Sequence, residues 1–212
     1  MDTDQLIRTL AADNETRPRS VGSALAVALA VALPISIVAF FVTLGFRSDI
    51  RTAMHNPFFD FKFVVTMSLA ASALVVGLHL SRPEASPRGW IWLLLTPVVL
   101  LVLAMAVEMM LPHSRPWLVR LIGNNSKLCM TAIPLLSLPL LIAGLIGLRH
   151  GASTRPALTG ALVGLLSAGL AATLYASQCN DDSPLFVITW YSLATALVTA
   201  IGAFAGSRLL RF

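Results

Sequence analysis

Long apolar runs alternate with short polar segments along the whole chain. Each run is long enough to supply the roughly 20 residues that a helix needs to cross a bilayer core. Backbone amides inside a bilayer need internal partners, which a helix provides. The pattern therefore predicts an all-α, polytopic membrane protein built as a six-transmembrane-helix bundle. Its spans are expected at residues 21–46, 61–80, 90–111, 131–148, 157–177 and 185–206.

Composition agrees with this interpretation and argues against several classes of protein. Of 212 residues, 57% are hydrophobic and 12% are charged, whereas soluble domains carry about a quarter charged residues. The segments between the runs are too short for a soluble catalytic domain, so we expect neither an enzyme nor a cofactor. The net charge of +5 is scattered between apolar runs, which is typical of membrane topology and not of direct DNA binding. The first apolar run is too long for a cleavable signal peptide.

The distribution of basic residues predicts the orientation. If the N-terminus is cytoplasmic, nine basic residues face the cytoplasm: Arg8, Arg17, Arg19, Arg82, Arg88, Arg149, Arg155, Arg208 and Arg211. The outer side then has Arg47, Arg51, Lys62, Arg115, Arg120 and Lys127. This bias favours cytoplasmic termini. We therefore expect a cytoplasmic segment at 1–20, a transmembrane sensor domain at 21–207 and a short cytoplasmic tail at 208–212. Lys62 is expected to extend its ammonium group to the membrane interface.

Glycines four residues apart recur in the last three runs. Glycines at this spacing line one helix face and let two backbones approach closely. Packing among spans four to six is the main interpretation, and a homo-oligomer face is the alternative. The pairs are Gly147/Gly151, Gly160/Gly164 and Gly202/Gly206.

Two cysteines carry the most informative chemistry. Cys129 is expected just before span four and Cys179 just after span five, so both lie at the outer side. A structural disulfide, two packed thiols and a thiol sensor all remain open. A quinone-coupled relay would need a CxxC motif, which the chain lacks. Glu108 is expected near the outer end of span three, either hydrogen-bonded to a neighbouring helix or within a polar cluster with His113, Cys129, Cys179, Asp181 and Asp182.

Nearby charges should tune the two thiols. Lys127 should lower the pKa of Cys129, whereas Asp181 and Asp182 should raise the pKa of a thiol beside them. Cys129 is then the more reactive member, and Cys179 is its partner in a disulfide or a shared soft-metal site. Further ligands for that metal would come from Glu108, His113, Asp181 and Asp182. A signal formed at the cysteines would cross the bilayer most simply if spans four and five shifted against each other, with their glycine faces in contact.

The N-terminal segment has the pattern of a short amphipathic helix. Asp4 lies near its start, where an acidic side chain favours the helix dipole, and Leu6, Ile7 and Leu10 fall on one face. Such a segment is too short to be stable alone, but it can fold in the groove of a partner. A solvated tail is the alternative.

Several motifs together resemble one family. Asp4–Asp13, Glu108, Cys129 with the following Ile133-Pro134, and the block Cys-x-x-Asp-Ser-Pro at 179–184 are its main elements. The segments 149–157 and 175–186, the Trp190-Tyr191 pair and the closing 208–211 complete it. This pattern, which extends over essentially the whole chain, is similar to that of the NrsF-type membrane anti-sigma factors of proteobacteria.

The resemblance implies a negative regulator that holds an extracytoplasmic-function (ECF) sigma factor at the bacterial inner membrane. It implies sigma binding by the N-terminal segment, through Asp4, Leu6, Ile7, Leu10 and Asp13. It also implies that Cys129 and Cys179 sense heavy-metal or oxidative stress. The alternatives are a small transporter or channel, with Glu108 as its intramembrane acid, and a membrane thiol enzyme. A transporter should have several ionisable groups near the midplane, and the other apolar runs have none deep inside.

Overall fold

The computed structural model describes residues 3–5, 21–80, 87–112, 116–149 and 155–210, and all regular structure within these ranges is helical. Six segments of it are long and apolar enough to cross a membrane. The predicted all-α, six-span architecture is therefore confirmed. The elements are α2 (Val21–Thr43), α3 (Ile50–Ala53), α4 (Pro57–Leu80), α5 (Pro87–Trp90), η1 (Ile91–Leu95), α6 (Thr96–Met110), α7 (Trp117–Ile122), α8 (Ser126–Leu148), α9 (Pro156–Ala176), α10 (Pro184–Phe186), η2 (Val187–Tyr191) and α11 (Ser192–Leu209).

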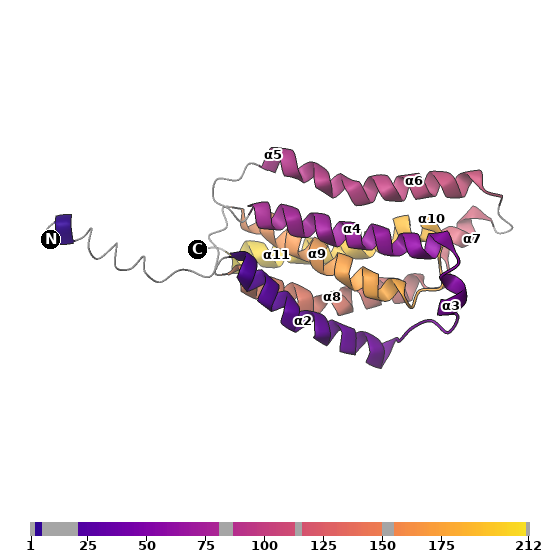
Figure 1. Ribbon diagram of the computed structural model, residues 1–212, viewed down its shortest axis with the longest axis horizontal. Helices are drawn as coiled ribbons and strands as arrows, with labels where there is room; N and C mark the ends of the chain where they lie inside the picture. Colours follow the sequence, from indigo (N-terminus) through magenta and orange to yellow (C-terminus); the bar gives the residue numbers. More distant parts are fainter. Residues whose placement is uncertain (1–2, 6–20, 81–86, 113–115, 150–154, 211–212) are drawn as a thin grey trace.

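The long helices lie side by side in one bundle, with α9 at its centre (Figure 1). Helix α9 contacts α4, α8 and α11, whereas α2 packs mainly on α8 and α6 mainly on α4. The first span begins and the last span ends at the same end of the bundle. We call the opposite end, where α2, α6 and α9 finish and α4, α8 and α10 begin, the distal end.

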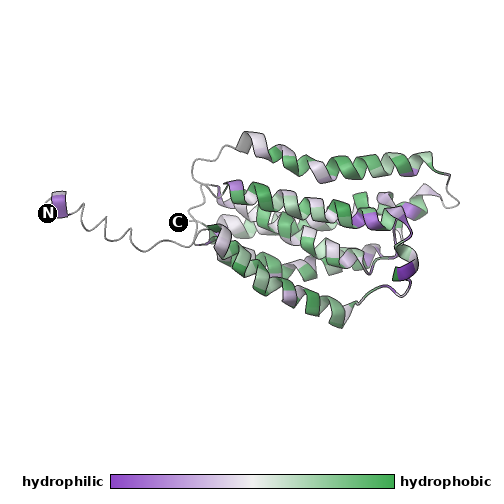
Figure 2. Cartoon of the chain, viewed as in Figure 1, coloured by the Kyte–Doolittle hydropathy of each residue, from purple (hydrophilic) through white to green (hydrophobic). Residues whose placement is uncertain are grey.

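Large apolar side chains cover the outside of the bundle. Val27 is 64% exposed, Val42 80% and Leu103 57%, a pattern that suits contact with lipid rather than water. Hydrophilic residues gather instead at the distal end, around α3, α7 and the start of α4 (Figure 2). The polar chemistry of the described chain is therefore concentrated at one end of an apolar bundle.

Glycines allow α9 and α11 to approach closely. A Cβ atom at Gly202 would lie 2.5 Å from the carbonyl oxygen of Gly160, and one at Gly206 would lie 2.6 Å from that of Pro156. Packing among spans four to six is thus confirmed, but the glycine faces that meet belong to spans five and six. The expectation that glycines of spans four and five face each other is wrong. Gly147 of α8 packs on α2, where Ala24 is its neighbour, and Gly151 lies outside the described residues.

Two helices begin earlier than the hydrophobic pattern predicts. Helix α4 begins at Pro57 and α8 at Ser126. Side chains at the distal end bind backbone amides at both starts: Asn56 Oδ1 accepts from the amide of Phe58, and Asp181 Oδ2 accepts from that of Asn125. Cys129 consequently lies inside α8 and not before it. The last span also contains one π-helical turn, Val187–Tyr191, a feature that is frequent at functional sites.

Candidate functional site

Both cysteines lie at the distal end, as the sequence predicted, but neither is exposed. Cys129 is in the first turns of α8 and Cys179 follows the end of α9, and each is 0% exposed. They share one hydrophobic cluster with Tyr175 and Tyr191, whose ring centroids are 5.7 Å apart. Both sulfurs are free thiols. The structure therefore has the pair in its unlinked form and closed to solvent.

The surroundings of Cys179 decide how readily its thiolate forms. Burial raises the pKa of Cys179, the positive charge of Lys62 lowers it, and the carboxylate of Asp181 raises it. The backbone of Asp181, a hydrogen-bond partner of the thiol, lowers the same pKa, so the predicted effect of Asp181 and Asp182 stays a prediction. The cation beside this thiol is Lys62, whereas Lys127 is exposed on the first turn of α8. The predicted order of reactivity of the two cysteines stays a prediction.

Lys62 and Arg47 converge on the segment that carries Cys179. Lys62 Nζ donates to the carbonyl oxygen of Cys179 at 2.9 Å, and Arg47 Nη1 donates to the same oxygen at 3.2 Å. Both cations also bind the carboxylate of Asp182, at 2.6 Å and 3.1 Å respectively. The segment 177–183 is therefore held at Cys179 and at Asp182 by the same two side chains.

This ion cluster is largely buried. Lys62 is 1% exposed, so the expectation that its ammonium group extends to the membrane interface is wrong. The reason is that Asp182 supplies a carboxylate inside the bundle, and both cations also lie over the ring of Phe59, at 5.2 Å for Lys62 and 5.5 Å for Arg47. Arg47 is further bound by Asp49, Nε to Oδ1 at 2.7 Å and Nη2 to Oδ2 at 2.8 Å. The carboxylates and the aromatic face together offset the desolvation of the two cations.

Glu108 forms a second buried ion pair at the same end. It is 1% exposed, and its Oε1 accepts a hydrogen bond from Arg120 Nη1 at 2.7 Å and another from the hydroxyl of Ser183. Its Oε2 accepts from the backbone amide of Leu185 at 3.1 Å. Glu108 therefore joins α6 to α7 and α10. The sequence analysis left open whether Glu108 is hydrogen-bonded to a neighbouring helix or acts as the intramembrane acid of a transporter. The bonds to α7 and α10 agree with the first interpretation.

Asp181 caps the start of α8. Its Oδ2 accepts from the backbone amides of Asn124 and Asn125, at 3.0 Å and 2.8 Å, and from Asn125 Nδ2 at 3.1 Å. Gly123 has a φ of 59°, and a Cβ there would lie 2.8 Å from Asp181 Cγ and 2.5 Å from Phe186 Cδ2. Only glycine fits both the backbone conformation and the space. The bonds from Asp181 to Asn124 and Asn125 therefore fix the segment that carries Cys179 against the start of the helix that carries Cys129.

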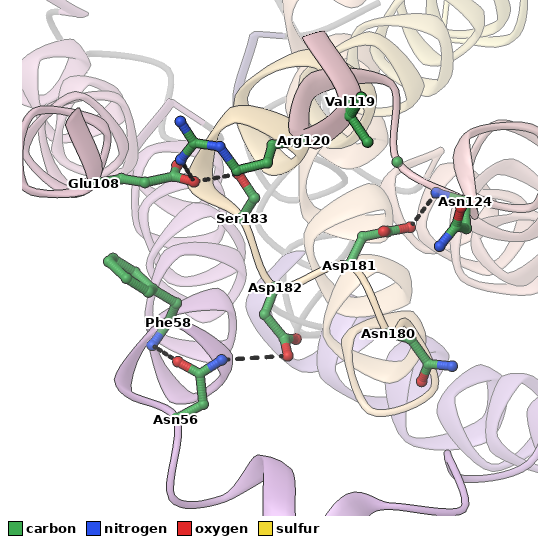
Figure 3. A pocket seen from close by; sticks show the side chains of 11 residues that line it. Asn56, Phe58, Glu108, Val119, Arg120, Asn124, Asn180, Asp181, Asp182 and Ser183 are labelled. Atoms are coloured by element: carbon green, nitrogen blue, oxygen red, sulfur yellow. Dashed lines mark hydrogen bonds and ion pairs between the residues drawn. The ribbon is translucent and has the colours of Figure 1, made fainter. Parts of the chain in front are cut away.

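A cavity of about 230 Å³ lies beside these groups. Figure 3 shows Glu108, Arg120 and Ser183 together at one part of it, and Asp181 and Asp182 at others. Neither cysteine is among its lining residues, although the residues that directly follow Cys179 are. The lining consists of Asn56, Phe58, Glu108, Val119, Arg120, Gly123, Asn124, Asn180, Asp181, Asp182 and Ser183.

The wider set of predicted metal ligands is not assembled in the described residues. No group of three or more His, Cys, Asp or Glu side chains there is arranged to hold a metal ion. Glu108, Asp181 and Asp182 each bind hydrogen-bond donors instead, and His113 lies outside the described residues. A metal site formed by the two cysteines stays a prediction.

The predicted sigma-binding residues lie mostly outside the described ranges. Asp4 belongs to a short helical stretch, residues 3–5, and is exposed. Leu6, Ile7, Leu10 and Asp13 are not described.

Sequence reasoning did not predict that Lys62, Arg47 and Arg120 form ion pairs inside the bundle. The signal was available for Lys62, because an ionisable residue inside an apolar run is usually paired and functional. Arg47 lies in a polar segment, where nothing in the sequence distinguishes a buried arginine from a solvated one. Arg120 lies among apolar residues, in the short stretch Trp117–Ile122, which the sequence analysis assigned to a loop.

The fold and the site define a small polytopic helical membrane protein with a buried thiol pair at one end. The chain belongs to the NrsF family, whose description is "negative regulator of sigma F" and whose model matches residues 10–212. It is 35% identical over 216 residues to the anti-sigma-F factor NrsF of Caulobacter vibrioides, with 100% of both chains covered. It is 31% identical over 216 residues to the probable anti-sigma-F factor NrsF of Azospira oryzae, again with 100% of both covered.

The family resemblance seen in the sequence is thereby confirmed, and the family is a regulatory one. No solved structure matches the chain.

Proposed function

We propose that this chain is a membrane-integral anti-sigma factor that holds an ECF sigma factor inactive and releases it when Cys129 and Cys179 meet heavy metals or oxidants. Full-length membership of the NrsF family supports the regulatory role. One observation carries the sensor role: the only two cysteines of the chain, 50 positions apart in the sequence, come together in one cluster at the distal end.

The proposed orientation places both termini in the cytoplasm and the distal end in the periplasm of a bacterial inner membrane. The excess of Lys and Arg in the segments at the end opposite the distal end supports this orientation. In this orientation the N-terminal segment is on the side where a sigma factor acts, and the cysteines are on the side where external stress arrives.

The N-terminal segment is the proposed contact for the sigma factor. Leu6, Ile7 and Leu10 would enter an apolar groove, and Asp4 and Asp13 would meet basic residues of the partner. Apolar anchors of this kind typically cost more than about 1 kcal/mol each when truncated. We expect the double change Leu6→Ser and Leu10→Ser to release the sigma factor in a reporter strain while the protein remains in the membrane.

A matched control is available one position earlier. In a helical segment, Gln5 and Thr9 would have the same spacing as Leu6 and Leu10 but would be rotated away from the apolar face, so Gln5→Ser with Thr9→Ser should leave repression unchanged. Full repression by the Leu6 and Leu10 variant would exclude this contact.

The proposed sensor chemistry is that of thiolates. A two-electron oxidant would remove two electrons and two protons from the thiol pair and form a disulfide, whereas a soft metal ion would displace the two protons. We expect serine at either cysteine to preserve repression and abolish induction by cadmium or by an oxidant, and alanine to have the same effect. Normal induction in both single variants would show that the cysteines are not the input.

A further inference from the structure

We propose that Lys62 and Asp182, assisted by Arg47, are positioning residues that form an ionic latch over Cys179. The closed latch holds segment 177–183 in place, and its opening lets water and thiol reagents reach the sulfur. The inference rests on the proposed function for its role in signalling, but access to the thiol can be measured independently of it.

The latch holds the segment at two points. Lys62 Nζ bonds the Cys179 carbonyl at 2.9 Å and the Asp182 carboxylate at 2.6 Å. Arg47 Nη1 bonds the same two groups at 3.2 Å and 3.1 Å. The two cations come from the start of α4 and from the segment after α2, so they connect three parts of the bundle. The segment cannot move outward unless these charge-assisted bonds break.

The segment separates the thiol from the cavity. Asn180, Asp181, Asp182 and Ser183 line the cavity of about 230 Å³, whereas Cys179 does not and is 0% exposed. A shift of this segment toward the cavity would therefore uncover the sulfur on the side where the polar residues gather. The cavity provides space for this movement.

The charges make the latch sensitive to loss of one partner. Lys62 has a side-chain exposure of 1% and Arg47 of 6%, and they share Asp182, whose side chain is 15% exposed. Without the Asp182 carboxylate, Lys62 keeps no carboxylate within bonding distance among the described ion pairs, while Arg47 keeps Asp49. A buried cation without a partner favours states in which it meets water. Loss of Asp182 therefore favours the open segment.

Asp182→Asn tests the latch with almost no change in shape. The labelling rate of Cys179 by a membrane-impermeant maleimide is measured in sealed membranes that expose the distal end, and the modified peptide is identified by mass spectrometry. We expect the rate to rise about tenfold, since the local opening becomes easier. Asp60→Asn is the matched control, because Asp60 is an exposed carboxylate in the first turn of α4 and is not among the groups that bind Lys62, Arg47 or Cys179, and it should label at the wild-type rate.

The double variant Asp182→Asn with Lys62→Met separates an open latch from a misfolded chain. It removes the unpaired cation together with the carboxylate, so the bundle regains its charge balance. The bonds from Lys62 to Asp182 and to the Cys179 carbonyl are lost, and only Arg47 still donates to that carbonyl. We expect thermal stability near that of the wild type and labelling as fast as in Asp182→Asn. Wild-type labelling in the double variant would overturn the latch, even if Asp182→Asn alone does not accumulate.

A reporter for sigma activity distinguishes the latch from the proposed function. Faster labelling with earlier induction by an oxidant supports both. Faster labelling without any change in induction supports the latch and refutes the cysteine-sensor role. Unchanged labelling refutes the latch, whatever the reporter does.

Discussion

The contact between α9 and α11 leads to a quantitative prediction at Gly160. A Cβ atom at this position would lie 2.8 Å from the Cα atom of Gly206 and closer still to the carbonyl oxygen of Gly202. These neighbours are backbone atoms of α11, which no side-chain rotation can move aside. Gly160→Ala therefore forces the two helices apart by roughly 1 Å in a close-packed interior.

The expected magnitude is a balance of two effects. Overpacking of this kind costs about 1–3 kcal/mol, while replacing glycine by alanine within a helix gains up to about 1 kcal/mol. The net expectation is a loss of up to about 2 kcal/mol. Gly77 of α4 is the matched control, because the nearest atom to a Cβ there is Leu162 Cβ at 3.9 Å. Gly77→Ala should therefore be neutral or stabilising.

The assay is thermal unfolding of the purified chain in detergent micelles, followed by the loss of helical circular dichroism. Gly160→Ala should lower the unfolding midpoint relative to the wild type, and Gly77→Ala should not. Equal midpoints for Gly160→Ala and Gly77→Ala would refute the close backbone contact between α9 and α11.

Three further predictions concern the distal end. Alkaline phosphatase fused after Ser183 should be active and after Ala152 silent, and the reverse pattern would exclude cytoplasmic termini. Glu108→Gln should destabilise the protein by about 2–3 kcal/mol in urea unfolding, because the buried guanidinium of Arg120 loses its carboxylate; an unchanged midpoint would contradict this pair. Because burial raises the pKa of the Cys179 thiol, the midpoint of its alkylation rate against pH should lie above the ordinary cysteine value of about 8.5, and a midpoint at or below that pH would contradict the raised pKa.

The sequence by itself determined the number of spans, the placement of polar chemistry at one end and the family. Hydrophobicity is a property of contiguous residues, so runs such as 21–46 could be recognised without any knowledge of their neighbours. The distal position of Cys129 and Cys179 followed from counting alternating spans. Glu108 could be identified for the same reason, as an acid near the end of an apolar run.

Only the tertiary structure decided which groups meet. Lys62 and Asp182 are 120 positions apart in the chain, and their pairing depends on how α4 packs against the end of α9. The same holds for the glycine faces, whose spacing predicts close packing but not the partner helix, which proved to be α11 for α9. The burial of both thiols also arises from packing, because the cluster that encloses them combines residues from distant parts of the chain, such as Phe40, Phe186 and Tyr191. Local patterns specify helices in a bilayer, whereas partners for buried charges are set by contacts between residues far apart in the chain.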